Sequence, residues 1–327
     1  MQNEYKENDD HGYILSEVHG RVSRILKSSE YKALLQSDNI DDVIVKLQGT
    51  TYSKYLSDSM EKSKMNLILS LDRAFKHEFN EIYRRSDGCL KVLLTFFLES
   101  YKIESFIYRM SNPEEPEEEL GFFVELNALK FSNDMREVKK FVIDETFLSR
   151  YFDKINVENN IEKNNFQIIK RMLMKYHIED FYSQVNGDMG FMKSVLEVMG
   201  SIQIIEIVLN TMHTNITADN RKKLFPDVND LDTRSIHSLA ECNTIDDLKA
   251  IIGKTAYRET LVAKDLLNGL QFYVLKVYYR SFSVFNDLSC VYCYLKLKEQ
   301  EIKNICWVVE FLGGDERDVM ENIYCVS

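Results

Sequence analysis

The pattern of hydrophobic and polar positions predicts a helix start that occurs twice in nearly the same letters. Asn39-Ile40-Asp41-Asp42-Val43 leads to Thr50-Thr51-Tyr52, and Thr244-Ile245-Asp246-Asp247-Leu248 leads to Thr255-Ala256-Tyr257. Each copy opens with a residue type that caps helices, and three positions later carries an acid that suits the first turn. Apolar residues then follow at the spacing of one helix face. The two stretches therefore predict two copies of one capped helix.

A weaker third copy lies between these two and slips by one residue in its second half. It begins at Asp134-Met135-Arg136-Glu137-Val138 and continues with Thr146-Phe147 and Tyr151-Phe152. One capped helix in each third of the chain predicts a helical unit that is repeated three times.

Each predicted cap is followed by a long amphipathic helix and then by a returning helix. The predicted pairs are residues 68–82 and 90–109, 166–182 and 191–209, and 261–285 and 291–311. Every return helix carries polar residues at a similar point of an otherwise apolar stretch. We interpret these polar groups as a packing seam between repeats; they are Tyr101 to Glu104, Gly200 to Gln203, and Lys298 to Glu301.

The three prolines divide the chain into three parts. Pro113 and Pro116 stand in the acidic stretch 112–119, and Pro226 lies near the start of the last third. Proline and clustered acids are typical of a solvated linker. We therefore predict one compact unit made of helical repeats over residues 1–111, 120–214 and 215–327, with an acidic linker at 112–119.

Composition favours an all-α fold. Among 327 residues there are only 12 glycines and 3 prolines, too few for the many tight turns of an all-β protein. The net charge of −11 argues against nucleic acid as the main partner, because phosphates need a basic face. A basic protein partner remains compatible with this charge.

The sequence predicts neither a targeting signal nor a membrane span. The first ten residues are polar and acidic, and the apolar run at 92–98 is closed by Glu99. We therefore expect any membrane association to go through a partner. The six cysteines are scattered apart from Cys290 and Cys293, a usage that favours a reduced, cytosolic chain.

The candidate catalytic motifs are incomplete. Gly253-Lys254-Thr255 resembles the end of a phosphate-binding loop, but Leu248 occupies the position of the required first glycine. Cys290 and Cys293 lack a second ligand pair at a spacing that zinc uses. The six histidines form no recognisable ligand motif. We therefore expect no catalytic residue, cofactor or metal. An enzyme that uses Cys290 and Cys293, with Cys306, stays open as an alternative that metal analysis would decide.

The chain as a whole resembles subunit d of the eukaryotic vacuolar-type proton ATPase, a family with relatives among the archaeal rotary ATPases. The positions that carry the resemblance are Gly12-Tyr13, Glu17-Val18 and Gly20; Tyr31, Leu34 and Gln36; Ile40-Asp41-Asp42 with Thr51-Tyr52; Glu78-Phe79-Asn80; Leu120-Gly121-Phe122-Phe123; Glu179-Asp180-Phe181-Tyr182; Arg221, Leu224 and Pro226; and the run from Lys298 to Trp307.

This resemblance implies an all-α fold of three pseudo-repeated helical bundles arranged as a funnel. It implies a non-catalytic subunit that caps the cytoplasmic side of the proteolipid c-ring and couples the ring to the central stalk subunits, of D and F type, during ATP-driven proton transport. The implied location is the cytoplasmic face of vacuolar or other endomembranes, peripheral and beside other membrane-sector subunits.

The alternative function is a helical-repeat scaffold for soluble protein partners. The sequence leaves the contact surfaces undetermined. We predict an interface at the exposed turn after the first long helix, through Arg84, Arg85 and Asp87.

Overall fold

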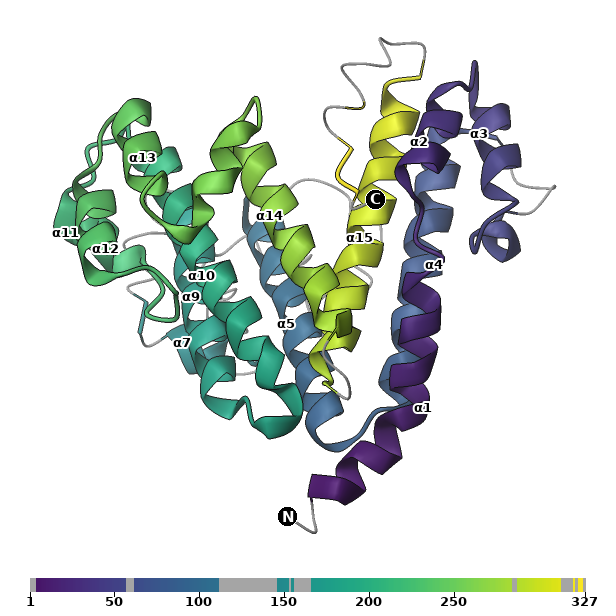
Figure 1. Cartoon of the computed structure of the whole chain (residues 1–327), viewed down its shortest axis with the longest axis horizontal. Coiled ribbons are helices and arrows are strands. Elements are labelled where there is room, and N and C mark those ends of the chain that lie inside the picture. The colour runs from purple at the N-terminus through teal and green to yellow at the C-terminus, as the bar shows by residue number, and fades with distance from the viewer. Residues whose placement is uncertain are drawn as a thin grey trace. The chain divides into compact units, whose positions relative to one another are not determined.

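The computed structural model describes residues 4–56, 62–111, 146–152, 154–155, 166–283, 287–312, 320 and 323–325, with the backbone alone for residues 4–10 (Figure 1). Every regular element within these ranges is helical, which confirms the prediction of an all-α fold. The chain divides into two compact units. Unit 1 comprises Met1–Val92, Asn186–Val195 and Ile252–Ser327, and unit 2 comprises Leu93–Val185 and Leu196–Ile251.

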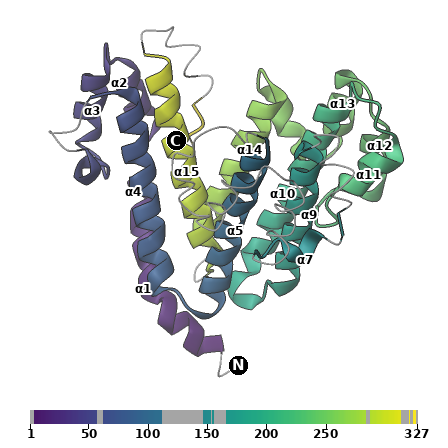
Figure 2. The same cartoon turned by 180° about the vertical axis from the view of Figure 1, so that it is seen from behind.

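Unit 1 is built on three long helices that lie side by side in both views (Figures 1 and 2). They are α1 (Glu4–Val22), α4 (Lys64–Arg85) and α15 (Ser289–Glu310), and α15 packs against both of the others. The shorter α2 (Ser28–Leu35) and α3 (Ile40–Leu47) connect α1 to α4.

The remaining helices of unit 1 precede α15 in the chain. α14 (Leu266–Arg280) packs against α15 and against the 3-10 helix η4 (Ala256–Val262). Shorter 3-10 turns occur at Ser53–Tyr55 (η1), Gly187–Met189 (η3) and Ser281–Ser283 (η5). The core joins residues that are far apart in the chain, with Val43, Leu47 and Leu71 packed in one cluster with Ile305 and Val308.

Unit 2 contains α7 (Ser149–Phe152), α9 (Phe166–Gln184), α11 (Ala218–Leu224) and α12 (Thr233–Glu241). Three of its boundaries with unit 1 fall inside α5 (Gly88–Ser111), α10 (Gly190–Thr211) and α13 (Ile245–Ile252), and the fourth lies just after α9. One apolar cluster joins Phe106 of α5, Tyr151 and Phe152 of α7, and Leu173 of α9.

The two strong copies of the predicted helix start are confirmed. The side chain of Asn39 accepts a hydrogen bond from the amide of Asp42 at 3.0 Å, and Thr244 accepts one from Asp247 at 3.2 Å. Both bonds satisfy an amide that the first helical turn leaves without a partner. The third start, at Asp134, and the acidic linker 112–119 lie outside the described residues.

The threonines that follow each copy adopt the same local turn. Thr50 Oγ1 accepts from the amide of Tyr52, Thr255 Oγ1 accepts from the amide of Tyr257, and both bonds measure 3.2 Å. In the predicted third copy, whose start is not among the described residues, Thr146 Oγ1 accepts from the amide of Leu148 at 3.3 Å. A short hydroxyl that bonds two residues ahead is a common turn-forming device.

The six long helices that the sequence predicts are confirmed as α4, α5, α9, α10, α14 and α15. The predicted helix 261–285 is too long at both ends. Asp265 caps α14 by accepting from the amides of Leu267 and Asn268, so the preceding residues form the separate helix η4. After Arg280 the chain tightens into a 3-10 turn. Within the described ranges, no helix combines the length and apolar character that a membrane span needs.

Candidate interaction site

The predicted interface residues lie at the turn between α4 and α5. Gly88 has φ of 45°, a left-handed conformation that glycine adopts without steric cost, so the chain can reverse here. Arg84 is exposed and makes no hydrogen bond or ion pair with another described residue. Arg84 is therefore the member of the three whose charge stays available at the surface.

Arg85 and Asp87 instead attach the turn to α1. Arg85 forms an ion pair of 2.8 Å with Glu17, and its guanidinium lies over the ring of Tyr13 at 5.7 Å. Asp87 lies 3.2 Å from Nε2 of His11, whose ring is buried. The structure thus brings Arg85 and Asp87 to a helix–helix contact, and leaves Arg84 beside them.

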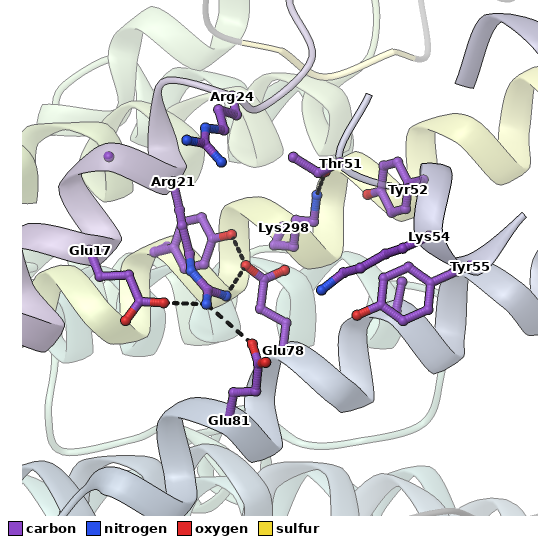
Figure 3. Close-up of a pocket in the computed structure, with 13 residues that line it drawn as sticks. Glu17, Arg21, Arg24, Thr51, Tyr52, Lys54, Tyr55, Glu78, Glu81 and Lys298 are labelled. Carbon is purple, nitrogen blue, oxygen red and sulfur yellow. Dashed lines mark hydrogen bonds and ion pairs between the residues drawn. The ribbon is translucent and has the colours of Figure 1, made fainter. Parts of the chain in front are cut away.

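Behind this turn, Arg21 of α1 is surrounded by carboxylates (Figure 3). Its guanidinium donates to Glu17 of its own helix, and to Glu78 at 2.5 Å and Glu81 at 3.2 Å on α4. Tyr294 of α15 donates to the same Glu78 oxygen. One arginine therefore cross-links α1 and α4, and Tyr294 adds α15 to the network.

The pKa values of this network follow from burial and charge pairing. Burial alone would raise the pKa of Glu17, but hydrogen bonds and charge from Arg85 and Arg21 outweigh it and lower that pKa. Burial alone would lower the pKa of Arg21, and the attraction of Glu78 reverses the effect. Both groups stay ionised, because in a partly buried site each favours the charged form of the other.

A second network, which is fully buried, centres on Glu301 of α15, whose exposed fraction is 1%. Glu301 accepts from the amide of Leu26 and from the phenol of Tyr52, both at 2.6 Å, and from the ammonium of Lys298. The Lys298 ammonium also lies 4.1 Å from the centre of the Tyr52 ring. A buried carboxylate of this kind is tolerated because its oxygens are hydrogen-bonded and its charge is paired.

Sequence reasoning identified Lys298 to Glu301 as a polar seam but not its partners. Leu26 and Tyr52 are the partners, and both lie in unit 1 with α15. In the predicted second repeat, Gln203 donates to the carbonyl of Arg171 on α9 at 3.1 Å. The sequence did indicate a buried ion pair within α15, because Lys298 and Glu301 stand three residues apart in an otherwise apolar helix.

Cys290 and Cys293 are fully buried on α15. Burial raises the pKa of the Cys290 thiol to about 12 and raises the pKa of Cys293 as well. The reactive thiolate is therefore strongly disfavoured at both positions. Across the described part of the chain, His, Cys, Asp and Glu side chains form no group of three that could hold a metal ion.

Arg21 and Glu301 thus connect separate segments of unit 1 through paired charges, while Arg84 remains exposed at the turn before α5. Thr255, in the segment that resembles a phosphate loop, bonds the carbonyl of Ile252 and the amide of Tyr257, as the end of a helix does.

The chain is similar in sequence to known proteins over nearly its whole length. The V-type proton ATPase subunit d of Saccharomyces cerevisiae is 24% identical over 338 residues, and the alignment covers 98% of each chain. The V-type proton ATPase subunit d of Neurospora crassa is 25% identical over 358 residues, again with 98% of each chain covered. The probable V-type proton ATPase subunit d of Oryza sativa subsp. japonica is 23% identical, over 94% of this chain and 93% of its own.

The family model described as the ATP synthase (C/AC39) subunit matches residues 14–322. This match includes both helices of each described pair, the polar seam on α15 and the turn at Arg84. The chain therefore belongs to the ATP synthase (C/AC39) subunit family.

Proposed function

We propose that this chain is a non-catalytic subunit of a vacuolar-type proton ATPase, with the role of subunit d. The observation that carries the proposal is the family match over residues 14–322, together with relatives named V-type proton ATPase subunit d that align over nearly their whole length. An alignment of that extent leaves no room for a separate catalytic domain within the matched region.

In finer detail, the protein caps the cytoplasmic side of the proteolipid c-ring and couples the ring to the central stalk subunits of D and F type. It is peripheral on a vacuolar or other endomembrane and lies beside other membrane-sector subunits. A coupling part must transmit force without bending. Two networks support this role: Arg21 and Tyr294 connect α1, α4 and α15 of unit 1, and Glu301 connects α15 to Leu26 and Tyr52.

We also propose that the fold consists of three pseudo-repeated bundles arranged as a funnel, with repeats at 1–111, 120–214 and 215–327. The turns of the same type at Thr50, Thr146 and Thr255 support a threefold repeat, as do the three helix pairs. In this arrangement the turn at Arg84, Arg85 and Asp87 contacts a neighbouring protein of the complex.

The experiment is a pull-down of the tagged chain from its own cells in mild detergent, with mass spectrometry of the co-purified proteins. Recovery of the proteolipid and stalk subunits is the expected result. Recovery of soluble proteins alone, without ring or stalk, would overturn the proposal and favour a scaffold for soluble partners. An untagged strain and a strain with a tagged, unrelated cytosolic protein serve as controls.

A further inference from the structure

Unit 1 contains a cavity of about 450 Å³ between α1, α4, α15 and the turn at residues 51–55 (Figure 3). This volume lies in the range of small-molecule sites in proteins. Its lining combines cations and carboxylates. The basic residues are Arg21, Arg24, Lys54 and Lys298, and the acidic residues are Glu17, Glu78 and Glu81.

The carboxylates of the cavity already form ion pairs within the protein. Glu17, Glu78 and Glu81 all accept hydrogen bonds from Arg21. Glu17 also pairs with Arg85, outside the lining. The acidic side of the cavity is therefore largely neutralised by the protein itself.

The opposite side of the cavity keeps positive charge. Arg24 and Lys54 are exposed, and neither forms an ion pair with a carboxylate of a described residue. In Figure 3 Arg24 lies to one side of Thr51, and the end of the Lys54 side chain lies toward Glu78. Lys298 is paired with Glu301 and adds a donor rather than a net charge. Arg24, in the turn after α1, and Lys54, in the 51–55 turn, thus line one cavity, and neither is paired with a carboxylate of a described residue.

We propose that this cavity binds a compact anion that carries two or more phosphate groups. Arginine and lysine are the side chains that proteins use for phosphate, and a guanidinium can bond two phosphate oxygens at once. Two separated cations and a volume larger than one phosphate favour a polyphosphorylated ligand over a single carboxylate. The same chemistry occurs in a free metabolite and in a phosphorylated lipid headgroup.

The test is isothermal titration calorimetry of the full chain with sodium tripolyphosphate at about 0.15 M ionic strength, where distant charges are screened. A second arm measures co-sedimentation with phosphatidylcholine vesicles, with and without phosphatidylinositol bisphosphate. Arg24→Ala/Lys54→Ala is the main variant. The matched control is Lys254→Ala/Arg258→Ala, which removes the same two charges from exposed positions of unit 1 outside the cavity.

We expect the main variant to weaken tripolyphosphate binding about tenfold or more, and the control to change it less than about twofold. Glu81→Gln should tighten binding, because it removes a half-exposed negative charge from the rim. Binding to phosphoinositide vesicles but not to tripolyphosphate, with the same variant response, would identify a lipid headgroup as the source. The proposal would be overturned if the wild-type chain bound neither tripolyphosphate nor phosphoinositide vesicles. It would also be overturned if the control variant lost as much affinity as the main variant.

Discussion

The phenol of Tyr52 donates a hydrogen bond of 2.6 Å to the carboxylate of Glu301, 249 residues further along the chain. Both side chains are buried, and burial together with the charge of Glu301 raises the pKa of Tyr52 well above its usual value. The phenol therefore stays protonated and remains a donor. This bond fixes the turn after α3 to the middle of α15.

We predict that Glu301→Gln destabilises unit 1 by about 3–5 kcal/mol, because Lys298 then remains charged and buried without its partner. Lys298→Met/Glu301→Gln should recover more than half of that loss, since it removes both charges together. Urea unfolding followed by the fluorescence of Trp307, the chain's one tryptophan and itself on α15, measures both variants. Costs that simply add in the double variant would contradict a coupled pair.

The cap residues give a second prediction. Asn39→Ala and Thr244→Ala should each cost about 1 kcal/mol, because each removes the acceptor for an amide in the first helical turn. The conservative controls are Asn39→Asp and Thr244→Ser, which keep an oxygen at the same place. Thermal melting measures the four variants, and unchanged melting temperatures for both alanine variants would refute the cap assignment.

His177 makes the stability of unit 2 depend on pH. Burial lowers the pKa of His177 to about 4, and the ring stacks on Phe96 while Nε2 donates to the carbonyl of the same residue. Between pH 6.5 and about 4 the unfolded chain binds a proton at this site and the folded chain does not. Stability should therefore fall as the pH falls through this window, by up to about 1.4 kcal/mol per pH unit.

Urea unfolding of the wild type and His177→Gln at several pH values tests this dependence. The nearby Glu99 has a raised pKa because of burial, which acts in the opposite direction, so the difference between the two proteins isolates the histidine. Parallel stability curves for the two proteins would show that His177 does not contribute.

The interface turn gives a prediction about assembly. Arg84→Glu should lower recovery of partner subunits in the pull-down by about tenfold, equivalent to roughly 1.4 kcal/mol, and leave the melting temperature unchanged. Arg73→Glu is the matched control, on the same helix and likewise exposed. Arg85→Glu should lower both recovery and melting temperature, because it also breaks the pair with Glu17. Full recovery with Arg84→Glu would place the interface elsewhere.

Substitution of Gly200 tests how closely α10 packs against the backbone at Val228 in unit 2. A Cβ atom added there would lie 1.8 Å from the carbonyl oxygen of Val228, so Gly200→Ala forces backbone movement and should cost about 1–3 kcal/mol. Gly12 on α1 has no heavy atom within 4 Å of the added Cβ position, so Gly12→Ala should be neutral or stabilise by up to about 1 kcal/mol. Thermal melting compares the two variants. Equal changes in melting temperature would contradict the close contact at Gly200.

The sequence by itself determined the elements that depend on near neighbours. The caps at Asn39 and Thr244 act within three residues, and the apolar stripes of α4 and α9 repeat within one or two turns, so their signals are local. The helical class followed from such signals along the whole chain, and the family from the resemblance of its motifs. The start of α14 at Leu266 also has a local cause, the cap at Asp265. The sequence prediction missed this cap because the apolar residues before it were assigned to the same helix.

Only the tertiary structure decided which polar residues meet. Glu301 and Tyr52 are 249 residues apart, and nothing near either residue indicates the other. The same holds for Arg21 with Glu78 and for the close approach of Val228 to Gly200. Hydrophobic burial brings the helices together without choosing polar partners, and a buried charge then requires whichever opposite group the packing places within reach.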